Sequence, residues 1–181
     1  FTISTRGNMT TVTGNDGNGV IYGCRELIDH VGQYKDLKFP AQLTDAPEMV
    51  LRGGCVGIQK MEYLPGRGVY EYPYTPESFP WFYDKEQWIK YLDMLVENRM
   101  NSLYLWNGHP FASLVKLEEY PFAVEVDEET FKKNEEMFSF LTAEADKRGI
   151  FVIQMFYNIL LSKPFAEHYG LKTQDRNRPI T

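Results

Sequence analysis

Aromatic and polar side chains capable of binding a sugar gather where two predicted strands end, at residues 102–107 and 150–157. Aromatic faces pack on C–H groups, and side-chain amides bridge neighbouring hydroxyls, so this combination predicts a site for a polyhydroxylated ligand. The alternative is that the aromatic residues are core and the others cap strand ends. The candidate ligand-binding residues are Trp106, Asn107, His109, Tyr157 and Asn158.

Arg52 is a further candidate, because it lies in the apolar segment 49–58, which predicts a strand buried on both faces. A buried guanidinium needs acceptors. Two interpretations stay open from the residues alone. Arg52 pairs with Asp45 or Glu48, or it reaches a hydroxyl or carboxylate of a ligand.

Other chemistries find no support in the sequence. The glycine-rich turn 14–19 fits neither a dinucleotide fingerprint nor a phosphate loop, and no Cys/His spacing predicts a metal, so we expect no cofactor. Glu118 and Glu119 lie in a loop and are weak candidates, and no Asp-Glu pair ends a strand. The catalytic residues are therefore not identified. Cys24 and Cys55 are predicted to be buried free thiols.

The elements that must position these residues alternate along the chain. Strands are predicted at 49–58, 102–107 and 150–157, with helices at about 85–98 and 128–148 that Asp84 and Asp127 cap. This order predicts a parallel sheet whose functional loops leave the carboxyl ends of the strands. The loops would be 59–83, 108–126 and the segment from 158 onward. The first of these is long enough to be either functional or a sign of missed elements.

The first 46 residues predict a separate small unit. Strands at 1–5 and 10–13 flank a turn, and a helix at 20–31 is expected to end at Gly32. We therefore divide the chain into residues 1–46, the last part of a small α/β accessory domain, and 47–181, the first part of a (β/α)8 barrel. Three strands cannot close such a barrel, so we expect a truncated chain and self-association through the incomplete barrel.

Composition excludes two classes of partner. The 181 residues carry a formal net charge of -6, which disfavours binding to a nucleic-acid backbone. No apolar run is long enough for a membrane span. The chain is 43% hydrophobic, which is sufficient for a core, and the 15% aromatic content suits stacking on sugars. Carbohydrate is the partner that these features favour.

Four short motifs resemble family 20 β-hexosaminidases and the related α-glucuronidases. They are DGNGVIYG at 16–23, DAP at 45–47, LRG at 51–53 and NRMNSLYLW at 98–106. The resemblance covers about residues 1–157. It implies an accessory α/β domain followed by a (β/α)8 barrel, with Arg52 matching the arginine that contacts sugar hydroxyls. The family's catalytic Asp-Glu pair follows the fourth strand, so we expect the catalytic carboxylates outside these 181 residues.

This chain also departs from the hexosaminidase pattern. Residues 106–110 read WNGHP where that family has a passage rich in histidine and aspartate, and loop 59–83 is longer. The leading hypothesis is therefore that the full-length protein is a glycoside hydrolase whose sugar substrate the sequence does not define. We expect the 181-residue segment alone to be inactive. The alternatives are a non-catalytic carbohydrate-binding protein and a different barrel enzyme. Only the resemblance indicates a compartment, which would be periplasmic or extracellular.

Overall fold

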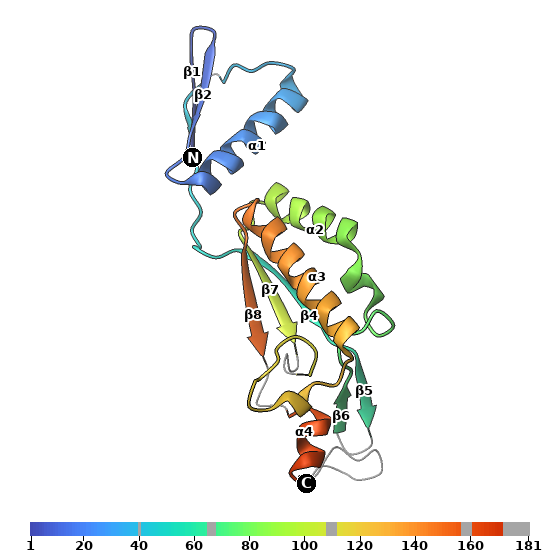
Figure 1. The fold of residues 1–181 in the computed structure, drawn as a ribbon. Coiled ribbons are helices and arrows are strands. Elements are labelled where there is room, and N and C mark those ends of the chain that lie inside the picture. The colour runs from blue at the N-terminus through green and yellow to red at the C-terminus, as the bar shows by residue number, and fades with distance from the viewer. Residues whose placement is uncertain (40, 65–67, 108–111, 157–160, 172–181) are drawn as a thin grey trace.

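The computed structural model describes residues 1–39, 41–64, 68–107, 112–156 and 161–171 (Figure 1). Two three-stranded sheets, one antiparallel and one parallel, organise an α/β fold. A two-stranded hairpin lies beyond the parallel sheet (Figure 1). In the part of the chain that is described, no helix is long and apolar enough to cross a membrane.

The antiparallel sheet has the order β2-β1-β3, formed by β1 (Thr2–Arg6), β2 (Met9–Thr13) and β3 (Leu43–Thr44). Helix α1 (Gly17–Tyr34) packs on it, and the Asp16 side chain caps the helix by accepting from the Gly19 amide at 2.6 Å. The predicted hairpin and helix are confirmed. The predicted end at Gly32 is wrong, because the helix continues to Tyr34 and Lys35 adopts the left-handed conformation at φ 57°.

The parallel sheet has the order β4-β7-β8, formed by β4 (Gly53–Ile58), β7 (Ser102–Asn107) and β8 (Phe151–Phe156). Helices α2 (Lys85–Glu97) and α3 (Glu128–Asp146) connect these strands and lie together over one face (Figure 1). Asp84 accepts from the Gln87 amide at 2.9 Å, and Asp127 accepts from the Thr130 amide at 2.7 Å. Both predicted caps and the parallel order are confirmed.

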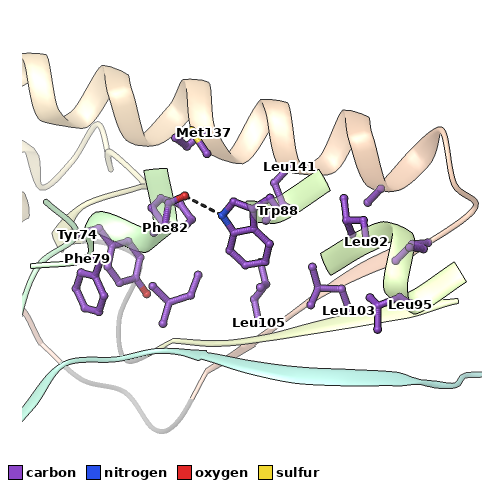
Figure 2. Packing of buried hydrophobic residues seen from close by; sticks show 13 residues of the cluster. Tyr74, Phe79, Phe82, Trp88, Leu92, Leu95, Leu103, Leu105, Met137 and Leu141 are labelled. Carbon is purple, nitrogen blue, oxygen red and sulfur yellow. Dashed lines mark hydrogen bonds between the residues drawn. The ribbon is translucent and has the colours of Figure 1, made fainter. Parts of the chain in front are cut away.

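The core lies between this sheet and its two helices (Figure 2). Trp88 is 4% exposed and donates its indole N–H to the Phe82 carbonyl oxygen at 2.8 Å, so its one polar atom is satisfied. Leu103 and Leu105 project from β7 into the same layer. Because successive strand residues point to opposite faces, Ser102, Tyr104 and Trp106 project the other way.

The predicted strand 49–58 is only half right. Met49, Val50 and Leu51 lie in an irregular segment and are 66%, 85% and 42% exposed, and the strand begins at Gly53. Apolar composition does not mean burial in this segment. The structure also resolves the question of loop 59–83, which holds the hairpin β5 (Met61–Leu64) and β6 (Gly68–Glu71) and the 3-10 helix η2 (Pro80–Tyr83).

The described residues also form two shorter helices, η4 (Pro121–Ala123) and α4 (Lys163–His168). The aromatic rings of Phe122 and Phe165 stack at a centroid distance of 5.9 Å, which joins these two elements. Cys24 and Cys55 are free, as predicted, but both are exposed rather than buried. Cys55 alternates with the core residues of β4 and therefore lies on the sheet face opposite the helices.

Candidate functional site

The carboxyl ends of the three parallel strands meet at one edge of the sheet. Ile58, Asn107 and Phe156 are paired in register, so the three following connections leave from neighbouring points. Neighbouring strands lie about 4.8 Å apart, which places these connections within reach of one small ligand. This edge, called the carboxyl edge below, is where a parallel α/β sheet presents its function.

Trp106 lies beside this edge, on the sheet face opposite the helices, and is 39% exposed. The backbone of Asn107 pairs with Ile58 and Phe156, but its side chain is outside the described part of the structure. His109, Tyr157 and Asn158 also lie outside the described residues.

The structure does not place Arg52 near Trp106 or the Asn107 backbone. Arg52 precedes β4, whereas Asn107 pairs with the last residue of that strand. Six residue steps at about 3.3 Å each separate the two levels by about 20 Å. Strand direction therefore places Arg52 and the Asn107 backbone at opposite edges of the sheet, and this geometry does not support the prediction that both hold one sugar.

Backbone carbonyls satisfy the Arg52 guanidinium at that opposite, amino edge. Its Nη1 donates to Met49 O at 2.6 Å, and its Nε donates to Arg99 O at 3.0 Å. The guanidinium also lies 5.7 Å from the centre of the Tyr22 ring. In the described part of the chain these backbone oxygens take the place of the carboxylates of Asp45 and Glu48 that the sequence suggested. The contacts fit a residue that fixes two backbone segments.

A cleft of about 850 Å³ lies between α1 and the amino edge. Its cations are engaged: Arg99 pairs with Asp45 at 2.5 Å and with Glu26. The Tyr22 hydroxyl donates to Met100 O at 3.2 Å, and burial raises the pKa of that phenol despite the nearby Arg52. Ion pairs and hydrogen bonds therefore link the two sides of the cleft, and the guanidinium groups of Arg52 and Arg99 that line it are already engaged.

The sheet face opposite the helices is uncovered among the described residues, and we call it the open face. Phe151, Met155 and Trp106 on this face are 61%, 43% and 39% exposed. The strand register and the alternation of side chains place all three on the same face of the sheet. Besides Ser102 and the β4 glycines Gly53 and Gly57, the residues of the open face are Cys55, Tyr104, Trp106, Phe151, Ile153 and Met155. An exposed apolar face of this kind is typical of an interaction surface.

Glu125 is a carboxylate near the carboxyl edge that sequence reasoning missed. It lies between η4 and α3, and its Oε1 accepts from the Lys163 amide at 2.8 Å. Burial raises the pKa of this carboxyl, although the Lys163 amide and ammonium oppose the change. Nothing in the surrounding sequence marks it, since the contact joins residues 38 positions apart. Glu118 and Glu119 are exposed.

No group of three or more His, Cys, Asp or Glu residues is arranged for a metal ion among the described residues. The described part of the chain therefore offers hydrogen-bonding and aromatic groups for a ligand. A parallel three-stranded sheet with helical connections on one face defines an α/β protein, the class in which ligands commonly bind at the carboxyl edge.

The chain is similar to a solved structure of a larger protein. Its title describes it as a GH138 enzyme targeting pectin rhamnogalacturonan II, and we call it the GH138 relative below. The chain is 79% identical to it, with a TM-score of 0.88, over 100% of this chain and 21% of that one. The chain thus spans about a fifth of the length of this relative. No family model matches the chain, and no curated protein matches it.

Proposed function

We propose that this chain forms part of a GH138-type glycoside hydrolase that cleaves glycosidic bonds in pectin rhamnogalacturonan II. The observation that carries the proposal is the 79% identity to the GH138 relative along the whole of the chain. At this identity the residues around a shared site are largely the same. The exposed Trp106 beside the carboxyl edge adds support, because an indole face suits a sugar ring.

The proposed architecture is an accessory domain, residues 1–46, and the first three strands of a (β/α)8 barrel, residues 47–181. The sequential parallel order β4-β7-β8 supports it, because adjacent barrel strands follow one another in the chain. The open face then becomes the barrel interior. Other strands of the complete protein cover it and supply the catalytic carboxylates.

In this proposal the sugar is held at the carboxyl edge. Trp106 packs on a sugar face, while Asn107, His109, Tyr157 and Asn158 contribute polar contacts from connections at the same edge. Arg52 stands apart at the amino edge, where it supports the sheet. The carboxyl separation that decides retention or inversion belongs to residues elsewhere in the protein.

The test uses the natural protein that carries this chain, incubated with purified rhamnogalacturonan II. Chromatography of the products should show release of a defined sugar, with none from homogalacturonan and none from heat-inactivated protein. Binding of rhamnogalacturonan II without any release would instead support the non-catalytic carbohydrate-binding alternative. Neither binding nor release would reject both functions.

We also propose that the 181-residue chain, made alone, associates through the open face. Its mass is 21.1 kDa, and light scattering should report a multiple of that value. Met155→Lys places a charge on this face, near the carboxyl end of β8, and should favour the monomer. Identical masses for the two proteins would contradict this surface as the contact.

A further inference from the structure

A buried asparagine joins the connections that lead to the carboxyl edge. Asn134 lies on α3 and is fully buried at 0% exposure. A primary amide in a core must satisfy two N–H donors and a carbonyl acceptor, because an unpaired polar group there is costly. Its partners therefore show what the residue is for.

The Asn134 amide makes three hydrogen bonds. Its Nδ2 donates to Tyr74 O and to Ser113 O, both at 2.9 Å, and its Oδ1 accepts from the Tyr83 hydroxyl. Burial, with a smaller effect of the Glu77 carboxylate, raises the pKa of Tyr83 well above its usual range, so this phenol remains a donor. A further bond, from the Tyr74 amide to Ser113 Oγ at 2.8 Å, closes the group.

These partners belong to different connections. Tyr74 lies between β4 and α2, whereas Ser113 lies between β7 and α3. Asn134 thus binds the backbone of two connections that both leave the carboxyl edge. Neither Tyr74 nor Ser113 lies in a helix or strand, so the Asn134 amide supplies both carbonyls with a partner from a side chain.

Glu125 extends the same linkage to the third connection. Its amide donates to Ala112 O at 2.8 Å, next to Ser113, and its carboxylate accepts from the amide of Lys163, which follows β8. Hydrogen bonds therefore run from the first connection through the second to the third. The described parts of all three connections are held relative to one another.

We infer that Asn134 is a positioning residue, which fixes the connections of β4 and β7 and thereby sets the catalytic efficiency of a carbohydrate site at the carboxyl edge. This inference rests on the proposed function. A shift of about 1 Å in the reacting groups, caused by a mutation far from them, can lower the rate by about 100-fold, so loosening these connections should have a measurable effect. Replacement of a core residue that only fills space should change stability without this specific loss of catalytic efficiency.

The main variant is Asn134→Asp, which keeps the shape and replaces the Nδ2 donor with an acceptor. The two carbonyls then face an oxygen, and the connections separate. The control is Leu141→Ala on the same helix, where a side chain with 0% exposure packs into the core away from Tyr74 and Ser113. It lowers stability through a cavity and leaves the linkage intact.

The natural protein is compared in three measurements: the melting temperature, hydrogen exchange of peptides covering 72–78 and 112–114, and kcat/KM on rhamnogalacturonan II. Asn134→Asp should speed exchange in both peptides and lower kcat/KM by about 10-fold or more. The deficit should shrink at low pH, where the buried carboxyl is protonated and donates again. Leu141→Ala should lower the melting temperature with kcat/KM nearly unchanged.

Ser113→Ala is the milder variant and serves if Asn134→Asp does not fold. It removes only the acceptor for the Tyr74 amide and should show the same pattern with a smaller change. The inference is overturned if kcat/KM follows the melting temperature equally in all variants, or if exchange in the two peptides is unchanged. If the wild-type protein neither binds nor cleaves rhamnogalacturonan II, the proposed function fails and hydrogen exchange alone decides on the linkage.

Discussion

The two edges of the parallel sheet use polar side chains in different ways. At the amino edge, Arg52 and Asn101 make their bonds to backbone within a few residues of where the strands begin. At the carboxyl edge, Asn134 and Glu125 tie long connections together while Trp106 stays partly exposed. Whether a polar side chain lies at the amino or the carboxyl end of the strands, and not its charge, therefore distinguishes a supporting residue from a candidate binding residue.

The first prediction tests the amino edge and has the largest expected effect on stability. Arg52→Ala should destabilise the protein by about 2–3 kcal/mol, because charged hydrogen bonds to the carbonyls of Met49 and Arg99 are lost. Denaturant unfolding measures the change. Arg25→Ala is the control, since the ion pairs of Arg25 with Asp29 and Glu97 are exposed and should cost less than about 1 kcal/mol.

Catalysis provides the second half of that test. With Arg52 at the amino edge, kcat/KM of the folded variant should equal that of the wild type. A tenfold loss in kcat/KM at unchanged stability would restore the role that the family resemblance implies for Arg52, and would remove the distinction between the two edges.

The second prediction compares two aromatic residues of the open face. Trp106→Ala should lower kcat/KM on rhamnogalacturonan II by about tenfold, since an aromatic contact contributes about 1.5 kcal/mol. Phe151→Ala is the matched control, because Phe151 lies on the same face at the amino end of β8 and is 61% exposed. Equal losses in the two variants would show that the whole face, and not its carboxyl end, contributes to binding.

Much of this comparison could be drawn from the sequence. The period of the apolar residues and the caps Asp84 and Asp127 predicted the order of strands and helices, because those signals are local. Strand 102–107 was predicted with its observed bounds. The carboxyl edge followed from the alternation of strand and helix. Local chemistry therefore determines where the connections leave the sheet.

The remaining features depend on contacts between distant residues. Asn134 and Tyr74 are 60 positions apart, so no window of sequence reveals the amide bond between them. The hairpin β5–β6 was missed because its strands have four residues each, too few for a periodic signal. The strand predicted at 49–58 begins only at Gly53, because the segment before β4 is apolar yet exposed, as Val50 shows at 85%.

The third prediction concerns backbone strain at the amino edge. Arg99 has φ 58°, a region that costs a non-glycine residue about 1 kcal/mol. Both Arg99→Ala and Arg99→Gly lose the ion pairs with Glu26 and Asp45, but only glycine relieves the strain. The glycine variant should therefore be more stable than the alanine variant by about 1 kcal/mol in denaturant unfolding. Equal stability would mean that the turn relaxes.

The fourth prediction is the smallest and concerns the pH dependence of the carboxyl edge. Burial raises the pKa of Glu125 above its ordinary value, so its contribution to stability is present at low pH and is lost as the pH rises through the folded pKa. Glu125→Gln keeps an acceptor for the Lys163 amide and removes the charge. Its melting temperature should exceed that of the wild type at neutral pH, and the difference should vanish in acid.

A lower melting temperature of Glu125→Gln at neutral pH would contradict this prediction. It would show that the hydrogen bond from the Lys163 amide to an ionised carboxylate stabilises the protein by more than burial of the charge costs. Lys163→Ala is a useful companion, because it keeps the backbone amide and removes only the ammonium that opposes the raised pKa. In the Lys163→Ala background, the gain in melting temperature from Glu125→Gln at neutral pH should then be larger.

The open face also has a consequence for synthesis on the ribosome. Translation proceeds at about 5–20 residues per second, so any cover encoded later in the chain arrives seconds after β8 has left the exit tunnel. During that interval Phe151, Met155 and Trp106 face water, and the outer edges of β4 and β8 have no strand beside them among the described residues. A holding chaperone that binds apolar strands has its target there, and polysomes bring neighbouring nascent copies within reach of the same face.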